Sequence, residues 1–394
     1  MNHRCQPTVP VAMFAALSLA SASALAINGA QPGGFGVKNA AMGGAAIALP
    51  LDAEAAANNP AGMAFVPKSF TLGLAVFKGE SSADYFLPGN RLENRTTLAV
   101  PTGGIDWPLG DRLSVGLSLA AQGVGADYRQ PALPVPGAGN AKSSLKVAEF
   151  IPTLAWKAGP TLALGASLNL VAQRFEASGV VVPAPVPGGF APLPSHGGED
   201  AHGLGIRLGA LWSPTPDLWL GANFKSRTRM SRLDGYANDL LAYSDGRIDV
   251  PAQFGAGAAW KVDDRVTLAA DWLRIEYSGL EVMQDPQGFG WKDQPVFRLG
   301  GSWAFDDAFT LRAGYSRNSN QIVASRLAQN LLVPSLFDRA YTAGLSWRAD
   351  KASELNIALE INPRRTVTGT DGSAGATLSA KACFLMLGYQ HRFD

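Results

Sequence analysis

The feature that most constrains this chain is an alternation of apolar with small or polar residues, which recurs in segment after segment from residue 69 onward. In 113–119 every second residue is Leu or Val, and the residues between are Ser or Gly. Similar patterns occupy 161–170 and 355–362. Successive side chains of a strand point to opposite faces, so a period of two predicts sheets with one apolar face. The alternation alone does not separate a membrane barrel from a half-buried soluble sheet.

The connections between these segments discriminate better. Every second connection is tight, as in 109–111 and 158–160, and the intervening ones are long, as in 126–142 and 179–201. Short turns on one side and long loops on the other are typical of an outer-membrane barrel with an even number of strands. The pattern predicts fourteen strands, which begin near Ser69, Thr97, Leu113, Ser144, Thr161, His202, Asp217, Arg247, Val266, Pro295, Phe309, Arg339, Ser353 and Ala376.

A closed barrel also satisfies the backbone in a membrane, because in lipid every N–H and C=O needs a partner and a barrel has no free edge. The chain is 47% hydrophobic, yet after residue 26 it contains no apolar run long enough for a membrane-spanning helix. Its 44 Gly and 26 Pro weaken helix interiors. We therefore predict an all-β fold, a 14-stranded antiparallel transmembrane β-barrel with an N-terminal plug (hatch).

Aromatic and polar positions add detail to this barrel. Six tryptophans lie beside tight turns and predict an aromatic girdle at one membrane interface, with ordinary core tryptophans as the alternative: Trp107, Trp156, Trp212, Trp260, Trp303 and Trp347. Polar residues on the face opposite the apolar one are expected to form an internal network in the lumen: Asn169, Asp271, Arg298, Arg312 and Glu360.

The first 26 residues have the pattern of a secretory signal peptide. Arg4 supplies the positive charge, 9–20 is a short apolar stretch, and Ala24-Leu25-Ala26 is a small-x-small cleavage pattern. Cleavage would remove Cys5 and leave Cys383 alone, which excludes an internal disulfide. It would also leave basic and acidic residues in equal number, because the whole chain holds 33 and 32. No basic excess points to nucleic acid.

Residues 27–66 form a separate unit that is rich in Ala and Gly and lacks strand alternation. The sequence Asn59-Pro60-Ala61 lies about 30 residues after the predicted cleavage site and precedes the predicted strands. With Gly34-Phe35-Gly36 and 41–46, this stretch resembles the hatch of the FadL-type outer-membrane transporters of long-chain fatty acids and aromatic hydrocarbons. Further similar pieces, such as 223–226 and 291–293, extend the resemblance over about residues 27–393.

The resemblance implies a domain organisation and a route. Residues 1–26 would be the signal peptide, 27–66 the hatch and 67–394 the barrel in the Gram-negative outer membrane. Ligand would enter an extracellular groove, reach an inner pocket, and leave sideways into the bilayer at a kink in the third strand. Here Gly123 and Gly125 match that kink, with relief of barrel curvature as the alternative reason for these glycines. Asn59, Pro60 and Ala61 are the expected hatch and gating residues.

Ligand contacts are expected on the hatch and the long loops. A desolvated carboxylate needs a cationic partner. Lys292, in a segment that resembles the family's ligand-contacting loop, and Arg174, near the extracellular end of the fifth predicted strand, are the candidates for a fatty-acid carboxylate. Solvated loop charges are the alternative. Exposed apolar loop residues usually mark a binding site. The candidate apolar contacts are Phe35, Phe190, Leu332 and Phe337.

Enzyme signatures are absent from the sequence, since neither a Gly-x-Ser-x-Gly elbow nor a phosphate loop is present. His196 and His202 flank Glu199 and Asp200, but their spacing matches no known metal site, so a solvated loop is the preferred interpretation. We expect no catalysis, no metal and no cofactor.

The expected function is outer-membrane transport of hydrophobic small molecules, with long-chain fatty acids first. The alternatives are an aromatic hydrocarbon or alkane channel of the same fold, a general diffusion porin, a structural barrel that transports nothing, and a soluble β-sandwich. Expected partners are the ligand, outer-membrane lipid and the barrel assembly machinery, with no nucleic acid and a monomeric state. That machinery reads a terminal aromatic residue in such barrels, whereas here Phe393 is followed by Asp394.

Overall fold

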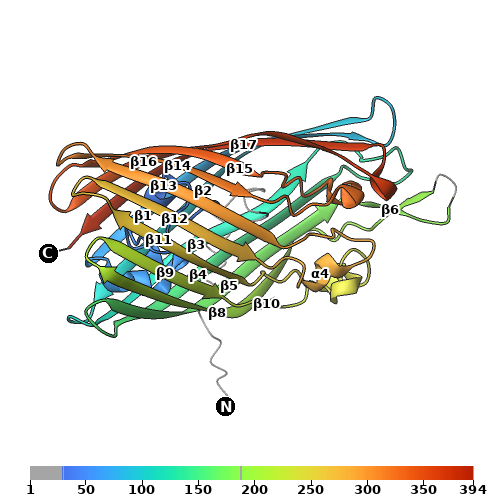
Figure 1. Cartoon of the computed structure of the whole chain (residues 1–394). Helices are drawn as coiled ribbons and strands as arrows, with labels where there is room; N and C mark the ends of the chain where they lie inside the picture. The colour runs from blue at the N-terminus through green and yellow to red at the C-terminus, as the bar shows by residue number, and fades with distance from the viewer. Residues whose placement is uncertain (1–28, 30, 187–188, 394) are drawn as a thin grey trace, which may run out of the picture.

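The computed structural model describes residues 29, 31–186 and 189–393, so the predicted signal peptide lies outside the described residues. Fourteen strands of this part of the chain form one closed antiparallel barrel (Figure 1). They are β1 (Ser69–Tyr85), β2 (Arg91–Pro108), β3 (Leu113–Asp127), β4 (Lys142–Lys157), β5 (Leu162–Ser178), β8 (Glu199–Thr215), β9 (Leu218–Lys225), β11 (Gln253–Lys261), β12 (Val266–Ile275), β13 (Gln294–Ala304), β14 (Phe309–Asn318), β15 (Arg339–Arg348), β16 (Ser353–Thr368) and β17 (Ala376–Arg392).

The barrel closes because the first strand pairs with the last. The β1–β17 ladder runs from Ser69 opposite Arg392 to Tyr85 opposite Ala376. Each of the other strands pairs with its neighbours in sequence order, and a further short strand, β10 (Arg229–Met230), pairs with β8. The predicted fold class and number of strands are therefore confirmed. Strand β2 begins at Arg91 and not near Thr97, because the charged and polar residues 91–96 extend its ladder with β1.

The apolar set of each strand faces outward, where lipid would lie. In β16, Leu355, Ile357, Leu359 and Ile361 are exposed, whereas the alternating residues between them are buried inside. The six tryptophans beside the tight turns are also exposed on the outer surface, so they are not core residues. Their positions agree with the predicted aromatic girdle.

The two ends of the barrel differ. Tight turns join the strands at one end, which we call the turn end, and long loops cover the other, the loop end (Figure 1). The loops carry the hairpin of β6 (Val181–Pro183) and β7 (Phe190–Pro192). They also carry the short helices η2 (Asp234–Tyr236), η3 (Ala242–Ser244), α4 (Glu281–Gln284), η4 (Ala324–Arg326), η5 (Ala328–Asn330) and η6 (Asp371–Ser373). No helix in the described ranges is long and apolar enough to cross a membrane.

Residues 31–66 lie inside the barrel toward its turn end (Figure 1), and we call them the N-terminal segment. They contain α2 (Val37–Ala40), α3 (Ala55–Asn58) and η1 (Pro60–Phe65). The segment is hydrogen-bonded to the barrel wall on several sides. The backbone N–H groups of Ala46 and Ile47 donate to Asp271 Oδ2 at 2.7 and 3.0 Å, and Gly43 N–H donates to Thr342 Oγ1 at 2.8 Å.

Candidate ligand cavity and lateral opening

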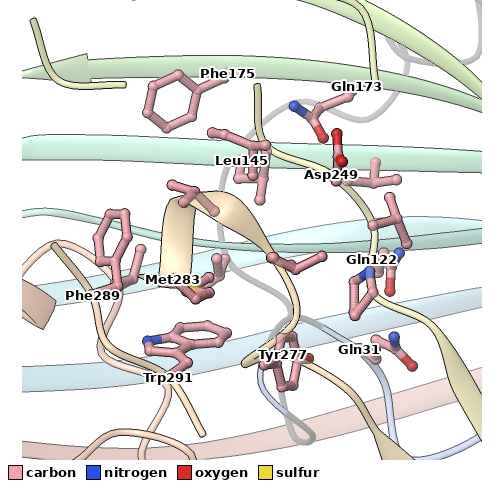
Figure 2. A pocket seen from close by; sticks show the side chains of 18 of the residues that line it. Gln31, Gln122, Leu145, Gln173, Phe175, Asp249, Tyr277, Met283, Phe289 and Trp291 are labelled. Carbon is pink, nitrogen blue, oxygen red and sulfur yellow. The ribbon is translucent and has the colours of Figure 1, made fainter. Parts of the chain in front are cut away.

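A cavity of about 700 Å³, including space open to solvent, lies inside the barrel on the loop side of the N-terminal segment, and we call it the main cavity. Three adjacent strands build one wall. Val124 of β3, Leu145 of β4 and Phe175 of β5 are register partners and form an apolar row. The loops supply an apolar and aromatic roof that includes Met283, Phe289 and Trp291 (Figure 2).

One side of the main cavity is polar. Gln122 of β3, Val147 of β4 and Gln173 of β5 form the next row toward the turn end. Figure 2 shows Gln122 and Gln173 on the same side of the cavity as Gln31 and Asp249, away from Phe289 and Trp291. None of the described lining residues is Lys, Arg or His. The main cavity is thus apolar at one end and carries amide groups and the carboxyl group of Asp249 at the other.

A buried ionic cluster lies one row further toward the turn end. Glu149 accepts hydrogen bonds from Lys225 Nζ at 3.0 Å, from Gln122 Nε2 at 2.7 Å and from the Arg207 guanidinium. Arg207 also donates to the carbonyl oxygen of Ala57 at 2.7 Å. The cluster therefore joins the floor of the main cavity to the N-terminal segment, and both of its cations are directed at Glu149.

The ladder between β2 and β3 is interrupted. It runs from Pro108 opposite Ser114 to Gly103 opposite Leu119 and stops there. Both strands continue beyond this point, since β1–β2 pairing extends to Arg91 and β3–β4 pairing to Asp127. We call the unpaired region between 91–102 and 120–127 the β2–β3 break. Pro101 favours a break here because it has no N–H to donate to a ladder.

A second cavity, of about 520 Å³ including space open to solvent, lies beside the β2–β3 break, and we call it the side cavity. Phe35 and Val37 of the N-terminal segment line it from within. Ala121 of β3 and Leu74 of β1 also line it, and Leu74 belongs to the exposed apolar set of the outer face. The side cavity is therefore lined both by the N-terminal segment and by the barrel wall on either side of the β2–β3 break.

The predicted kink residues Gly123 and Gly125 lie on β3 within the β2–β3 break. A Cβ atom at Gly123 would be 2.3 Å from the carbonyl oxygen of Leu145, and one at Gly125 would be 2.3 Å from that of Ser143. Both glycines therefore allow β3 to approach β4 closely. Gly125 also lines a third cavity, of about 340 Å³, together with Phe337.

The predicted hatch signature is buried against the barrel wall. Asn59 Nδ2 donates to the carbonyl oxygens of Ile47 at 2.7 Å and Ala210 at 3.1 Å, and its Oδ1 accepts from Ala61 N–H at 3.1 Å. Asn59 thus caps η1, which begins at Pro60, and fixes it to β8.

The remaining predicted ligand residues lie around the cavities and not within their linings. Lys292 is exposed, whereas its neighbour Trp291 is buried in the main cavity. Arg174 is about half exposed and pairs with Asp200 at 2.8 Å. Phe190 belongs to the loop hairpin, and the carbonyl oxygen of Leu332 accepts a hydrogen bond from Ser143. Their ligand-binding roles stay predictions.

A set of buried charges lies inside the N-terminal segment. Lys38 Nζ is 3.2 Å from Glu354 Oε1, and burial lowers the pKa of Lys38. Burial raises the pKa of Asp52. Burial, followed by the charge of Asp52, raises the pKa of Glu54 well above its ordinary value. The carboxyl group of Glu54 is therefore held toward its neutral form.

The histidines of the long loop do not form a metal centre with their neighbours. His196 Nε2 lies 2.6 Å from Asp239 Oδ2, and its ring packs edge-on against Tyr236. The part of the chain that the structure describes contains no group of three or more His, Cys, Asp or Glu placed to hold a metal ion. The absence of a metal or cofactor in the protein stays a prediction.

Sequence reasoning missed Pro101, Gln31, Gln122 and Gln173. The signal for Pro101 was present, because a proline inside a strand pattern indicates an edge or an interruption. The glutamines had no local signal. Gln122 and Gln173 are each the register partner of Val147 on β4, and this common row depends on a register that no short motif records.

A closed barrel with an apolar outer face, an occupied interior and an apolar cavity defines an outer-membrane transport barrel. The chain belongs to the family of outer membrane transport proteins described as OMPP1/FadL/TodX, whose model matches residues 13–393. The predicted resemblance and the outer-membrane location are confirmed. The family transports hydrophobic compounds and is not an enzyme family. A soluble β-sandwich is therefore wrong.

Solved structures show the same fold. The toluene transporter TodX of P. putida is 21% identical, with a TM-score of 0.68 over 92% of this chain and 99% of that one. A FadL homologue of Pseudomonas aeruginosa is 18% identical, with a TM-score of 0.70 over 93% and 100%. The toluene transporter TbuX of Ralstonia pickettii is 18% identical, with a TM-score of 0.65 over 92% and 99%. No curated protein matches the sequence.

Proposed function

We propose that this protein binds hydrophobic small molecules in its main cavity and releases them sideways into the outer membrane through the β2–β3 break. The observation that carries the proposal is the side cavity, which is lined both by Phe35 of the N-terminal segment and by Leu74 of the outer face. In this proposal, residues 27–66 act as a hatch that prevents straight passage through the barrel.

The route follows from the energetics of apolar molecules. Each methylene that leaves water gains about 0.8 kcal/mol, so capture in an apolar cavity is favourable and release into water is costly. Release into lipid avoids that cost, because the ligand passes from one apolar surrounding to another. A lateral exit therefore suits hydrophobic cargo better than an aqueous pore.

The ligand class is the finer part of the proposal. The lining of the main cavity carries no cation among the described residues, which favours uncharged molecules over fatty-acid anions. Two of the similar solved proteins are toluene transporters. Long-chain fatty acids, which the sequence favoured, are the second candidate. The observation in their favour is the cluster of Glu149 with Arg207 and Lys225, which carries two cations for one carboxylate.

The lateral route is tested by bridging the break. We would replace Val100 and Ala121 with Cys in a Cys383→Ser background, join the pair with a short bifunctional thiol reagent, and measure uptake of p-xylene and oleate by whole cells. The bridge is expected to abolish uptake of both compounds, and cleavage of a reducible bridge is expected to restore it.

The matched control places cysteines at Ile105 and Leu117, which are direct register partners in the intact part of the same ladder. A bridge there should leave uptake unchanged. Full uptake with the Val100–Ala121 bridge in place would refute lateral release at this site.

Lys292→Ala and Arg174→Ala separate the two ligand classes. If either cation captures a carboxylate, oleate uptake falls and p-xylene uptake does not. Equal uptake of both compounds by both variants would remove these residues from ligand capture and favour the uncharged class.

A further inference from the structure

We propose that the main cavity selects molecules that combine an apolar body with a single hydroxyl group, such as phenols and medium-chain alcohols, through Gln31, Gln122 and Gln173. This inference rests on the proposed function, because it assigns a ligand chemistry to the same cavity. It names the residues that recognise the ligand's polar end.

The three glutamines lie on the same side of the main cavity. Gln122 and Gln173 are both register partners of Val147, so they occupy one row of the inner wall two strand spacings apart, or roughly 10 Å. Gln31 of the N-terminal segment lies on the same side of the cavity (Figure 2). Three amide side chains from separate parts of the chain therefore line the same end of the main cavity, beside Asp249.

Each of the three glutamines has a buried side-chain atom that lacks a hydrogen-bond partner among the described residues. All three glutamines are at least 95% buried. Within the described ranges, Gln31 Nε2, Gln173 Nε2 and Gln122 Oε1 have no hydrogen-bond partner. Buried polar groups are normally paired, so each of these atoms favours a ligand that completes its bonding. The set offers two donor nitrogens and one acceptor oxygen.

A hydroxyl group has the complementary set. It donates through one O–H and accepts through two lone pairs, so it could donate to Gln122 Oε1 and accept from an amide nitrogen of a neighbouring glutamine. A pure hydrocarbon would leave all three atoms unpaired. A carboxylate would place a second acceptor against Gln122 Oε1.

Charge disfavours a carboxylate further. The carboxyl group of Asp249 lines the cavity, and its ion-pair partner Arg227, 2.7 Å away, does not line it. Arg207 and Lys225 are bound to Glu149 one row below the glutamines. A ligand carboxylate placed beside the glutamines would therefore lie near Asp249 and would have, among the described lining residues, no free cation with which to pair.

The apolar end fits an aromatic or branched body. Trp291 is held in place by a 2.6 Å hydrogen bond from its Nε1 to Asn330 Oδ1, and its ring packs edge-on against Tyr277 at 5.0 Å. Phe175 and Phe289 line the same space. A ring placed against these residues would direct its substituent toward the glutamines.

The test is calorimetric titration of the purified protein in detergent with p-cresol, p-xylene and p-toluate. The three probes share one ring and differ in bearing a hydroxyl, a methyl or a carboxylate. We expect p-cresol to bind about 10-fold more tightly than p-xylene, the ratio that one or two buried hydrogen bonds support. We expect p-toluate to bind most weakly.

Variants then assign the effect to the glutamines. Gln173→Leu and Gln31→Leu should each weaken p-cresol binding about 5- to 10-fold and leave p-xylene binding unchanged or tighter. Gln287→Leu, at an exposed loop glutamine, is the control and should change neither.

Three outcomes would overturn the inference: equal affinity for p-cresol and p-xylene, equal losses for both in the variants, or tightest binding of p-toluate. In each of these the cavity still binds ligand, and the proposed function stands. Binding of none of the probes would instead contradict the proposed function itself.

Discussion

The side-chain oxygen of Asn59 occupies the space that a side chain at Gly209 would need. A Cβ atom at Gly209 would lie 1.9 Å from Asn59 Oδ1. Gly165, the register partner of Gly209 on β5, meets the next residue in the same way, because its Cβ would lie 2.3 Å from the carbonyl carbon of Pro60. Two glycines on neighbouring strands thus form a flat area of wall against which Asn59 and Pro60 pack.

Gly209→Ala tests this packing. The added methyl group overfills a closed contact, which costs typically about 1–3 kcal/mol, so we expect the midpoint of urea-induced unfolding to fall. The barrel itself should still assemble, as judged by heat-modifiable migration in gels. Gly159→Ala is the control, because no atom lies within 4 Å of a Cβ at that tight turn. Identical unfolding of the two variants would contradict the tight fit.

Asn59→Ala removes three hydrogen bonds that hold the N-terminal segment. The backbone groups left unpaired in a buried site cost about 1–3 kcal/mol. We expect normal amounts of protein in the outer membrane but impaired uptake of p-xylene. Unimpaired uptake would argue against a role of this residue in the hatch.

Gly123→Ala tests the geometry of the β2–β3 break. Its methyl group would meet the carbonyl oxygen of Leu145, so β3 must move away from β4. We expect uptake to fall and stability to decrease by about 1–3 kcal/mol. Gly139→Ala, in the loop that follows β3, has open space around it and should behave as the unmodified protein. Wild-type uptake by the Gly123 variant would show that close approach to β4 is not required.

Glu54→Gln tests the buried acid of the N-terminal segment. The folded-state pKa of Glu54 is raised above its ordinary value of 4.5, so the folded protein retains a proton that the unfolded chain loses. Stability therefore decreases as the pH rises above about 4.5. The neutral amide has no such dependence. We expect the variant to unfold at higher urea concentration than wild type at pH 7, with the difference vanishing near pH 4.

The barrel could be predicted from the sequence because its strands follow a local rule. Alternating side chains identify each strand, and the sorting of short and long connections identifies two ends. Strand β2 was predicted too short because Arg91, Glu93 and Arg95 face outward beyond the apolar band and read as loop residues.

The candidate site was less accessible from the sequence because contacts over long separations build it. Asn59 could be identified from a motif, whereas its close contact with Gly209 depends on the register of β5 and β8. Lys292 was predicted from its charge and from the resemblance of its segment to the family, yet in the fold the adjacent Trp291 is the residue that lines the main cavity. Alternation shows which residues share a face but not which neighbouring residue of a loop turns inward.

The position of the N-terminal segment imposes an order on biogenesis. This segment is synthesised before any strand, yet it is held by Ala210 of β8, Asp271 of β12 and Thr342 of β15, which emerge much later. Once β1 and β17 have paired, the barrel is closed around it. The N-terminal segment must therefore remain without these hydrogen bonds until β8, β12 and β15 have formed. The barrel then closes around it.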